Sequence, residues 1–522
     1  MAEDLPELTP EQRALLILRL RKKTASAAER PSVEAPPIVP VSRDRDLPLS
    51  FAQQRLWFLD QLEPNNPFYN IPLAVRLRGA LDTAALERSF SEMVRRHESL
   101  RTTFVVNEGE PVQVIAPPAR FSLEVQDLSA AAPEQREEQA RRLAAEEAGM
   151  PFNLARGPLL RVTLLRLGEE EHVLLLTMHH IVSDGWSMSV LVREVAALYE
   201  AYSRGEESPL EELPIQYADF AVWQREWLSG EVLEKQLGYW REQLAGAPPV
   251  LELPTDKPRP EIQTYEGAIE LLEFSEELSE RLREMARREG VTLFMLLLSA
   301  FAVLLSHYSG QEDVVVGAPV ANRNHFDTES LIGFFINMLV LRTSLEGDPT
   351  FRELLHRVRD TTLGAYAHQE VPFEKLVEKL QPERGAMQTP WVQVAVDFES
   401  VKVATVKLPS LTLEPFGRDG IIAAKFDLVL SIQGMQQRLG ASMTYNTDLY
   451  SAPRIKAMLK HLELALTAVP DRPEIRVGEL QQLVAETERQ QRLAEQDEFK
   501  KSRLKLLKGV KPKAIHSSLN QS

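Results

Sequence analysis

The sequence predicts a mixed α/β (α+β) protein that is divided into two lobes. Apolar runs of strand length, such as residues 173–178 and 313–317, alternate along the chain with helical patterns, as they do in mixed folds. Residues 293–305 form a longer apolar run between Thr292, a helix cap, and Gly310, a helix terminator, so we expect a buried core helix there. A chain of 522 residues is too long for one compact core, which favours two lobes or several domains.

Composition and charge argue against several classes of function. The net charge is −16 and the pI about 5.3, whereas nucleic-acid binding needs a basic face. The chain contains no cysteine, so it has no disulfide and no thiol nucleophile, which fits a reducing cytoplasm. Its acidic start, Met1 to Asp4, is not followed by a secretory signal, and the run at 293–305 is shorter than the roughly 20 residues that a membrane span requires. We therefore expect a cytoplasmic protein with neither nucleic acid nor membrane as its partner.

Four segments differ in composition. We expect a leader at residues 1–46, which begins with a helix and continues as a Pro-rich linker. The first lobe is expected at residues 47–260, with a polar, Pro-rich connector at its end, and the second lobe at residues 261–484. Residues 485–522 are polar and then basic, with seven Lys or Arg between 500 and 513. The leader is either a helix packed on the body or a docking element, and the tail is either solvated or a linker to a partner domain.

The most informative segment is the loop from His179 to Gly185, which reads His-His-Ile-Val-Ser-Asp-Gly. It follows the strand predicted at residues 173–178, and Ser187 is expected to cap the next helix. Two imidazoles therefore lie in a short loop between a strand and a helix. This arrangement suits acyl transfer, because an imidazole can contact a nucleophile, the carboxylate of Asp184 can fix the loop, and the glycine lets the backbone approach a substrate.

Zinc binding is an alternative for paired histidines. Neighbouring residues on a strand point to opposite faces, so His179 and His180 do not easily share one metal ion. No third ligand stands at a metal-binding spacing in the sequence. We therefore expect no metal site, and we expect His179 to point away from His180 and to pack.

Five further segments accompany the His loop in a fixed order, and the six together span about Leu47 to Leu480. The five are residues 49–57, 96–102, 217–224, 332–337 and 368–373. In sequence and in order they resemble the motifs of the condensation domains of nonribosomal peptide synthetases, which also carry a His-His-x-x-x-Asp-Gly motif. Six ordered matches are far more specific than one match alone.

The resemblance implies two chloramphenicol-acetyltransferase-like lobes that form a V, with the active site in the cleft between them. It also implies a reaction, in which an upstream acyl or peptidyl thioester is joined to the amine of a downstream aminoacyl thioester as an amide. Both substrates would be held on the 4'-phosphopantetheine arms of donor and acceptor carrier proteins, and no cofactor would be bound directly. Adjacent synthetase subunits or a tailoring enzyme would be further partners.

The resemblance and the chemistry of the loop assign roles to individual residues. His180 would position the entering amine and accept its proton as the tetrahedral intermediate forms. The backbone N–H of Gly185, near a helix start, is a candidate donor to the developing oxyanion. Asp184 is expected to fix the loop by pairing with an arginine, with Arg101 as the first choice and Arg323 as the second.

Three further side chains are candidates for substrate contact, and each has a structural alternative. Asn337 is a candidate by its position in the family pattern, and a role at the end of a strand suits it equally. Trp186 is alternatively a packing residue, and Ser187 is alternatively a turn or cap residue.

Related functions are alternatives to amide formation. The same scaffold can epimerise substrates or form esters, and some condensation-like domains are non-catalytic platforms that hold a tailoring oxidase against a carrier. The intact His180 and Asp184 favour an enzyme. Residues 385–387 favour a platform, since they read Gly-Ala-Met where the family usually has an Asp and a Ser. Amide formation is the leading hypothesis.

Overall fold

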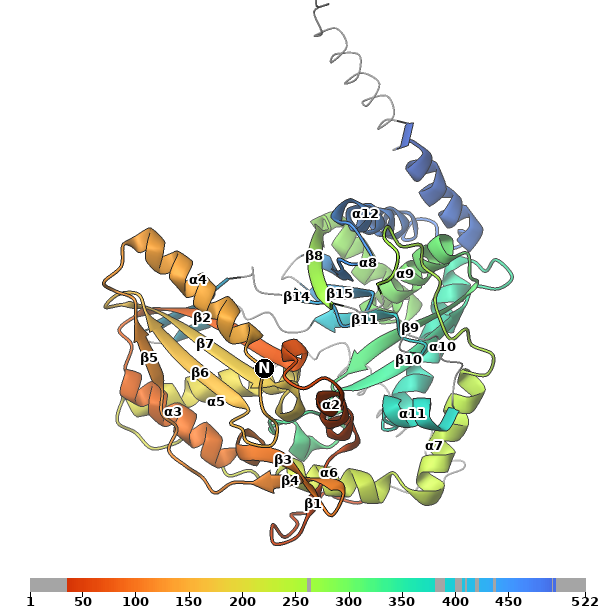
Figure 1. Ribbon diagram of the computed structural model, residues 1–522. Helices are drawn as coiled ribbons and strands as arrows, with labels where there is room; N and C mark the ends of the chain where they lie inside the picture. The colour runs from red at the N-terminus through yellow and green to blue at the C-terminus, as the bar shows by residue number, and fades with distance from the viewer. Residues whose placement is uncertain are drawn as a thin grey trace, which may run out of the picture.

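The computed structural model describes residues 35–493 except for 261–263, 381–389, 400–405, 409–410, 418–421, 435–437 and 491. Two lobes, each built on a β-sheet, stand beside each other as the arms of a V and meet at its base (Figure 1). The expected α/β (α+β) fold class is confirmed by this mixture of sheets and helices.

The first lobe surrounds a six-stranded sheet. Its strands and helices are β2 (Asn70–Gly79), β5 (Glu124–Asp127), β6 (Leu160–Arg166), β7 (Glu171–His179), α3 (Thr83–Arg96), α4 (Pro133–Gly149) and α5 (Gly185–Ser203). Helices α3 and α5 cover one face of the sheet and α4 covers the other (Figure 1). Strand β7 lies between β2 and β6 and pairs antiparallel with both. It is an almost continuous apolar run because both of its faces are buried.

The second lobe surrounds a seven-stranded sheet in the order β10-β9-β11-β15-β16-β8-β14. The strands are β8 (Glu266–Glu273), β9 (Asp313–Val320), β10 (Asn337–Ser344), β11 (Val394–Glu399), β14 (Ile422–Ala423), β15 (Leu428–Gly434) and β16 (Leu439–Asn446). The helices are α8 (Glu276–Glu289), α9 (Leu293–Ser309), α10 (Phe351–Ala367) and α12 (Ala452–Ala468). The predicted core helix is confirmed as α9, with Thr292 as its cap and Gly310 left-handed at its end.

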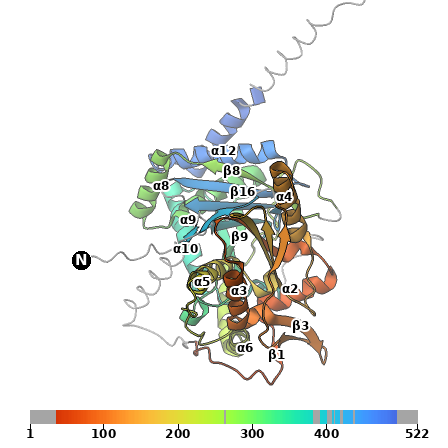
Figure 2. The same ribbon diagram turned by 90° about the vertical axis from the view of Figure 1, so that its left-hand side faces the viewer.

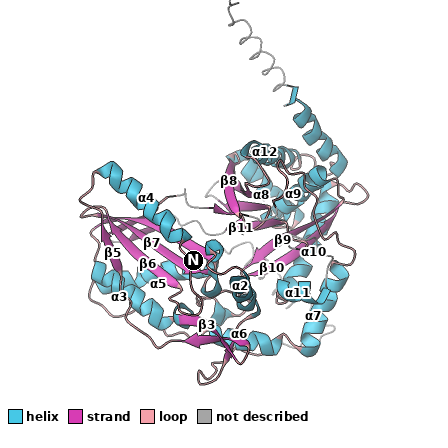
Figure 3. Ribbon diagram, in the orientation of Figure 1, coloured by secondary structure: helices cyan, strands magenta, loops and turns pink. Residues whose placement is uncertain are grey.

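Short helices and a small sheet form the base of the V. They are α2 (Phe51–Leu62), α6 (Tyr217–Trp227), α7 (Gly230–Gln243), α11 (Phe373–Leu380), β1 (Leu47–Pro48), β3 (Thr102–Asn107) and β4 (Glu110–Ile115). Figure 3 shows the helices of the base running from the first lobe to the second. Arg55 of α2 and Glu374 of α11 form an ion pair of 3.0 Å that joins the lobes here.

Two segments numbered with the second lobe cross into the first. Strands β12 (Val406–Leu408) and β13 (Leu411–Pro415) extend the first lobe's sheet, where β13 pairs with β2. Residues 331–336 also reach across, and Ile332 packs in the core between the first lobe's sheet and its helices. A boundary at residues 260/261 therefore does not separate the lobes completely.

The described part of the leader packs on the body, whereas the described part of the tail continues a helix of the second lobe. Residues 35–46 have no regular structure, as expected of a linker, yet the indole N–H of Trp223 donates to the Pro36 carbonyl at 2.8 Å. At the other end, residues 477–490 form a helix that leads away from α12 (Figure 2). Leu480 and Val484, which precede the tail, are buried, and the described tail residues from 485 on are mostly exposed. The expected leader helix and the basic run at 500–513 lie outside the described residues.

Within the described ranges, no single helix is long and apolar enough to cross a membrane. Helices α8 and α9 meet that test only as a pair, across a bend of 103°.

Candidate active site

The His loop lies where β7 ends and α5 begins. His179 is the last residue of β7, His180 opens a short 3-10 turn that ends at Val182, and Asp184 caps α5. The strand lies where the sequence predicts it, and the sequence also predicts Ser187 as the helix cap. That expectation is wrong, because the Asp184 carboxylate accepts the backbone N–H of Ser187 at 2.8 Å and the helix begins at Gly185.

One ring nitrogen of His180, Nε2, has no hydrogen-bond partner among the described residues. Its Nδ1 lies 3.0 Å from the carbonyl oxygen of Ser183, which only accepts hydrogen bonds, so the neutral ring carries its proton on Nδ1. Nε2 is then left as a proton acceptor. The half-buried ring stands edge-on against Phe334, with 5.1 Å between the ring centroids. Burial holds the pKa of His180 well below its usual 6.5, and the positive charge of Lys425 lowers it further.

His179 is a packing residue, as expected. It is 3% exposed, and its Nδ1 accepts the backbone N–H of Ile181 at 3.1 Å. Its ring lies against Phe152 and Tyr69, at centroid distances of 6.0 and 6.3 Å. Burial lowers the pKa of His179 to about 3, so its ring is neutral. The two histidines therefore diverge, one into the core and one toward Phe334.

Replacing His179 with alanine is expected to act through stability. The change leaves the buried N–H of Ile181 without its acceptor, and a buried unsatisfied donor costs about 1–3 kcal/mol. Chemical unfolding would measure this loss, and the activity of the folded fraction is expected to stay near that of the parent. An unfolding midpoint equal to the parent's together with lost activity would instead make His179 part of the reaction.

Asp184 fixes the loop through a buried network. It is 1% exposed, and its Oδ1 accepts from the guanidinium of Arg323 at 3.2 Å while its Oδ2 accepts the backbone N–H of Phe335 at 3.0 Å. The first-choice partner from sequence analysis, Arg101, is wrong: its guanidinium donates to the Ala116 carbonyl instead. The second choice, Arg323, is confirmed. Burial lowers the pKa of Arg323, and the Asp184 charge opposes that shift.

The three residues after Asp184 differ in exposure and in their contacts. Gly185 is exposed, and a Cβ built on it would meet nothing within 4 Å, so its backbone borders open space. Trp186 packs against the core of the first lobe and donates its indole N–H to the Glu329 carbonyl at 2.9 Å. Ser187 is fully buried, and its hydroxyl bonds with Asp184, Arg323 and the backbone of Gly333. Ser187 therefore holds the loop to residues 331–336, and the expected substrate contact does not fit this placement.

The hydrogen bonds of Asn337 fit a role at the end of a strand, which is one of its two expected roles, rather than substrate contact. Its Nδ2 donates to the carbonyls of Gln369 and Val371 at 2.7 and 2.8 Å. Its Oδ1 accepts the backbone N–H groups of Met338 and Phe373 at 2.9 and 3.1 Å. All of its hydrogen-bonding capacity is thus used to tie the start of β10 to the segment before α11.

Tyr217 is a site residue that was not predicted from the sequence, although it lies in one of the matched motifs. Its buried hydroxyl bonds with Ser50 at 2.8 Å and donates to the carbonyl of Phe334. Its ring is so close to Gly333 that a Cβ there would lie 1.9 Å from it, so only glycine fits. Tyr217 thereby sets the position of Phe334, which contacts His180.

Other motif segments also meet at the loop. The amide of Gln53 donates to the carbonyl of Ile181 at 3.1 Å, and the hydroxyl of Ser99 donates to the carbonyl of Ile332 at 2.7 Å. Segments far apart in the sequence therefore build one constellation around His180.

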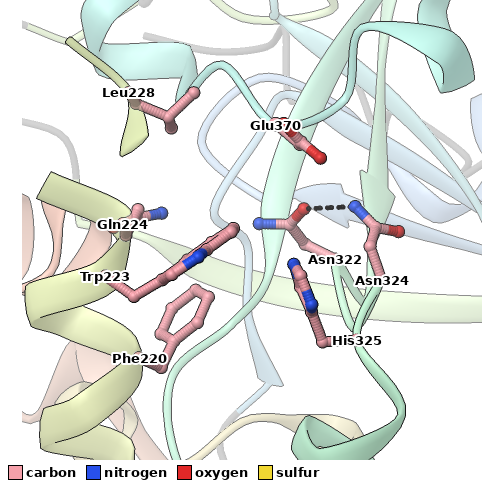
Figure 4. A pocket seen from close by; sticks show the side chains of 8 residues that line it. All are labelled: Phe220, Trp223, Gln224, Leu228, Asn322, Asn324, His325 and Glu370. Atoms are coloured by element: carbon pink, nitrogen blue, oxygen red, sulfur yellow. Dashed lines mark hydrogen bonds between the residues drawn. The ribbon is translucent and has the colours of Figure 1, made fainter. Parts of the chain in front are cut away.

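A pocket lies between α6 and the turn that follows β9 (Figure 4). Its empty volume is about 270 Å³. Its lining is Phe220, Trp223, Gln224, Leu228, Asn322, Asn324, His325 and Glu370. No residue of the His loop lines it, so we do not place acyl transfer there. The described residues also contain no cluster of three or more side chains suited to hold a metal ion.

Known proteins resemble this chain over most of its length. A family model described as the condensation domain matches residues 43–493. One linear gramicidin synthase protein of Brevibacillus parabrevis is 50% identical over 464 residues, which cover 89% of this chain and 6% of that protein. Phosphinothricin tripeptide synthetase PhsC of Streptomyces viridochromogenes is 43% identical over 471 residues, which cover 89% of this chain and 42% of that protein. The chain thus spans less than half of either relative.

Solved structures give the same fold. The X-domain in its complex with OxyB from teicoplanin biosynthesis has a TM-score of 0.78 at 30% identity, over 86% of this chain and 99% of that one. The first condensation domain of the calcium-dependent antibiotic synthetase has a TM-score of 0.69 at 22% identity, over 84% of this chain and 98% of that one.

Proposed function

Because the chain belongs to the condensation-domain family of nonribosomal peptide synthetases, we propose that it forms an amide bond between two carrier-bound thioesters. The observation that carries the proposal is His180, whose Nδ1 is bonded to Ser183 so that Nε2 is free to accept a proton. Open space beside Gly185 gives a substrate access to the loop. We expect the reaction to take place in the cytoplasm.

The amine of the acceptor is itself the nucleophile. Its reference pKa is about 8, so on the order of a tenth is uncharged at neutral pH. The amine nitrogen attacks the thioester carbonyl carbon, and the π electrons move to the oxygen, which the Gly185 N–H would stabilise. The C–S bond then breaks with its electron pair on sulfur. The proton lost by the amine passes through Nε2 of His180 to the departing thiolate.

Two carrier proteins are the proposed partners, one for the donor and one for the acceptor. Each would present its substrate on a 4'-phosphopantetheine arm, and two bulky carriers do not fit on one face of the molecule. We therefore propose that the arms enter from opposite faces and meet at His180. Sequence from both lobes borders this site, since Phe334, which is numbered with the second lobe, contacts the ring of His180 in the first lobe.

A recruitment platform is the second candidate. It is supported by the likeness to an X-domain whose solved complex contains OxyB. On that view the partner would be a tailoring oxidase, and the altered segment at 385–387, which lies outside the described residues, would reflect lost catalysis. The free Nε2 of His180 and the intact Asp184–Arg323 pair favour catalysis instead.

Replacing Gly185 with tryptophan is expected to block product formation. Among the described residues no atom lies within 4 Å of the Cβ position, so the indole would enter the open space beside Gly185, at the end of the His loop, without displacing the core. Each loaded carrier is expected to bind as it does to the parent chain, while the acyl group is not transferred. Carrier binding and transfer are measured on the same samples, with transfer followed by the mass of the acceptor carrier.

Gly168→Trp is the matched control. Gly168 lies in the turn between β6 and β7, at the other end of β7 from the His loop, and it also has nothing within 4 Å of its Cβ position. Transfer by this variant should equal that of the parent. Transfer at the parent rate by Gly185→Trp would mean that the reaction does not pass beside this loop.

A further inference from the structure

A cluster of aromatic rings joins the two lobes outside the helices and strands of the base. Phe68 belongs to a short 3-10 turn of the first lobe, η1 (Pro67–Tyr69). Its ring centroid lies 4.3 Å from that of Tyr265 in the second lobe. The ammonium of Lys425, also in the second lobe, lies 5.8 Å from the ring centroid of Phe68 and 5.5 Å from that of Tyr69, within the range of cation–π contacts. We call Phe68, Tyr69, Tyr265 and Lys425 the clasp.

The clasp lies beside the strand end that carries the two histidines. The ring of Tyr69 is 6.3 Å from that of His179, measured between centroids. Asn70, the next residue, opens β2 and is the partner of His179 in the pairing of β2 with β7. The clasp therefore closes the V next to the His loop, while the ion pair of Arg55 and Glu374 joins the lobes at the base.

The second lobe presents its half of the clasp at a strained position. Tyr265 has a φ of 58°, a left-handed conformation that is unusual for a bulky side chain. Hydrogen bonds hold it there, since its carbonyl accepts the N–H of Ala424 at 2.9 Å and the carbonyl of Glu266 accepts the N–H of Thr447 at 3.0 Å. Strain of this kind persists only where its surroundings enforce it, and it gathers at functional sites. A costly backbone conformation thus brings the Tyr265 ring to Phe68.

The contacts of the clasp are of a kind that parts readily. In the described ranges, ring stacking and cation–π contacts alone join its two sides. The three rings are half-buried and Lys425 is exposed, so water can replace these contacts as the sides separate. The buried pair of Asp184 and Arg323 meanwhile keeps the two halves of the chain joined. The lobes can therefore part at the clasp without coming apart at the base.

We propose that the clasp is a gate of the V: it holds the lobes together beside the His loop, and it parts to admit a carrier-bound arm and to release the product. Closure behind the arm would keep water from hydrolysing the thioester. The passage of an arm rests on the proposed function, whereas the parting of the lobes does not. The clasp residues touch no reacting atom and take up no proton.

The first test measures the distance between the lobes. The chain has no cysteine, so Glu146→Cys on α4 and Leu271→Cys on β8 place one dye on each arm of the V (Figure 1). Both positions are exposed. Energy transfer between the dyes is expected to show a larger open fraction when Phe68→Ala is added, and Phe68→Tyr, which keeps the stacking, should restore the parent distribution. Phe326→Ala, which removes an exposed aromatic ring elsewhere, is the control and should change nothing.

The second test locks the gate. Phe68→Cys/Tyr265→Cys is linked by a short bis-maleimide and purified before loaded carriers are added. Single-turnover transfer is expected to fall by about tenfold or more relative to the same variant without the link, because the clasp no longer parts. Thr103→Cys/Val114→Cys, which are paired across β3 and β4 within one sheet, is linked in the same way as the control and should keep its rate.

Either of two results would overturn the proposal. One is a distance distribution that Phe68→Ala leaves equal to the parent's, and the other is a linked clasp variant that transfers as fast as the unlinked one. Absence of product from the parent chain would contradict the proposed function instead. The distance measurement needs no product, so the two failures are distinct.

Discussion

Replacing His180 with alanine is expected to abolish amide formation from two loaded carriers while the fold survives. The ring is half-buried and supplies the one imidazole nitrogen of the described His loop that is left to accept a proton, so its loss removes the proton acceptor at the reaction site. General acid–base groups contribute about 10²–10⁴-fold to rate, and a loss of this size is expected in single-turnover assays.

Two variants make that result specific. His180→Asn retains an N–H that can donate to the Ser183 carbonyl, so it preserves the loop while lacking Nε2, and it should be as inactive as the alanine variant. His172→Ala removes a buried histidine at the far end of β7 and should leave the rate per folded molecule unchanged. Most of the parent activity in a folded His180→Ala protein would refute the role given to this residue.

Replacing Asp184 with asparagine is expected to cause the largest loss of stability. Breaking a buried ion pair by neutralising one partner typically costs about 3–5 kcal/mol, because the other charge stays buried. Here the guanidinium of Arg323 would be left without its counter-charge, and the asparagine amide has one acceptor oxygen where Asp184 has two. Denaturant unfolding measures the loss, with Asp127→Asn on the exposed edge strand β5 as the control.

Asp184→Asn also separates the role of Asp184 in stability from any direct role in amide formation. In a background stabilised enough to keep Asp184→Asn folded, we expect amide formation to fall by less than it does in His180→Ala. A double-mutant cycle with Arg323→Met should show strong coupling, because the two side chains form one network. A variant that unfolds at the parent's denaturant concentration yet makes no product would make Asp184 a direct participant.

The parts of the site that follow from local patterns could be predicted from the sequence. The sequence predicted that the side chains of His179 and His180 diverge, and the structure packs the first against Phe152 and the second against Phe334. They diverge because β7 ends at His179 and His180 opens a 3-10 turn. Thr292 and Gly310 fixed the ends of α9 in the same way. The N-cap of α5 was predicted wrongly as Ser187, because Asp184 also suits a cap and the observed hydrogen bond to the Ser187 N–H assigns the cap to Asp184.

The parts that depend on long-range packing could not be predicted from local patterns. Arg101 and Arg323 are equal in chemistry, and Arg323 reaches Asp184 only because residues 331–336 cross to the first lobe and carry its loop with them. The pairing of β13 with β2 likewise has no local signal, although it joins residues more than 300 positions apart.

The most direct test of amide formation is the mass of the acceptor carrier after a single turnover. Donor and acceptor carriers, each loaded through its phosphopantetheine thiol, are mixed with the wild-type chain or with buffer alone, and the intact carriers are weighed over time. We predict that the acceptor carrier gains the mass of the donor acyl group, that the donor carrier loses it, and that the rate saturates with both carriers. If both carriers bind but the acceptor mass grows no faster than in buffer, the chain is a platform and the account is wrong.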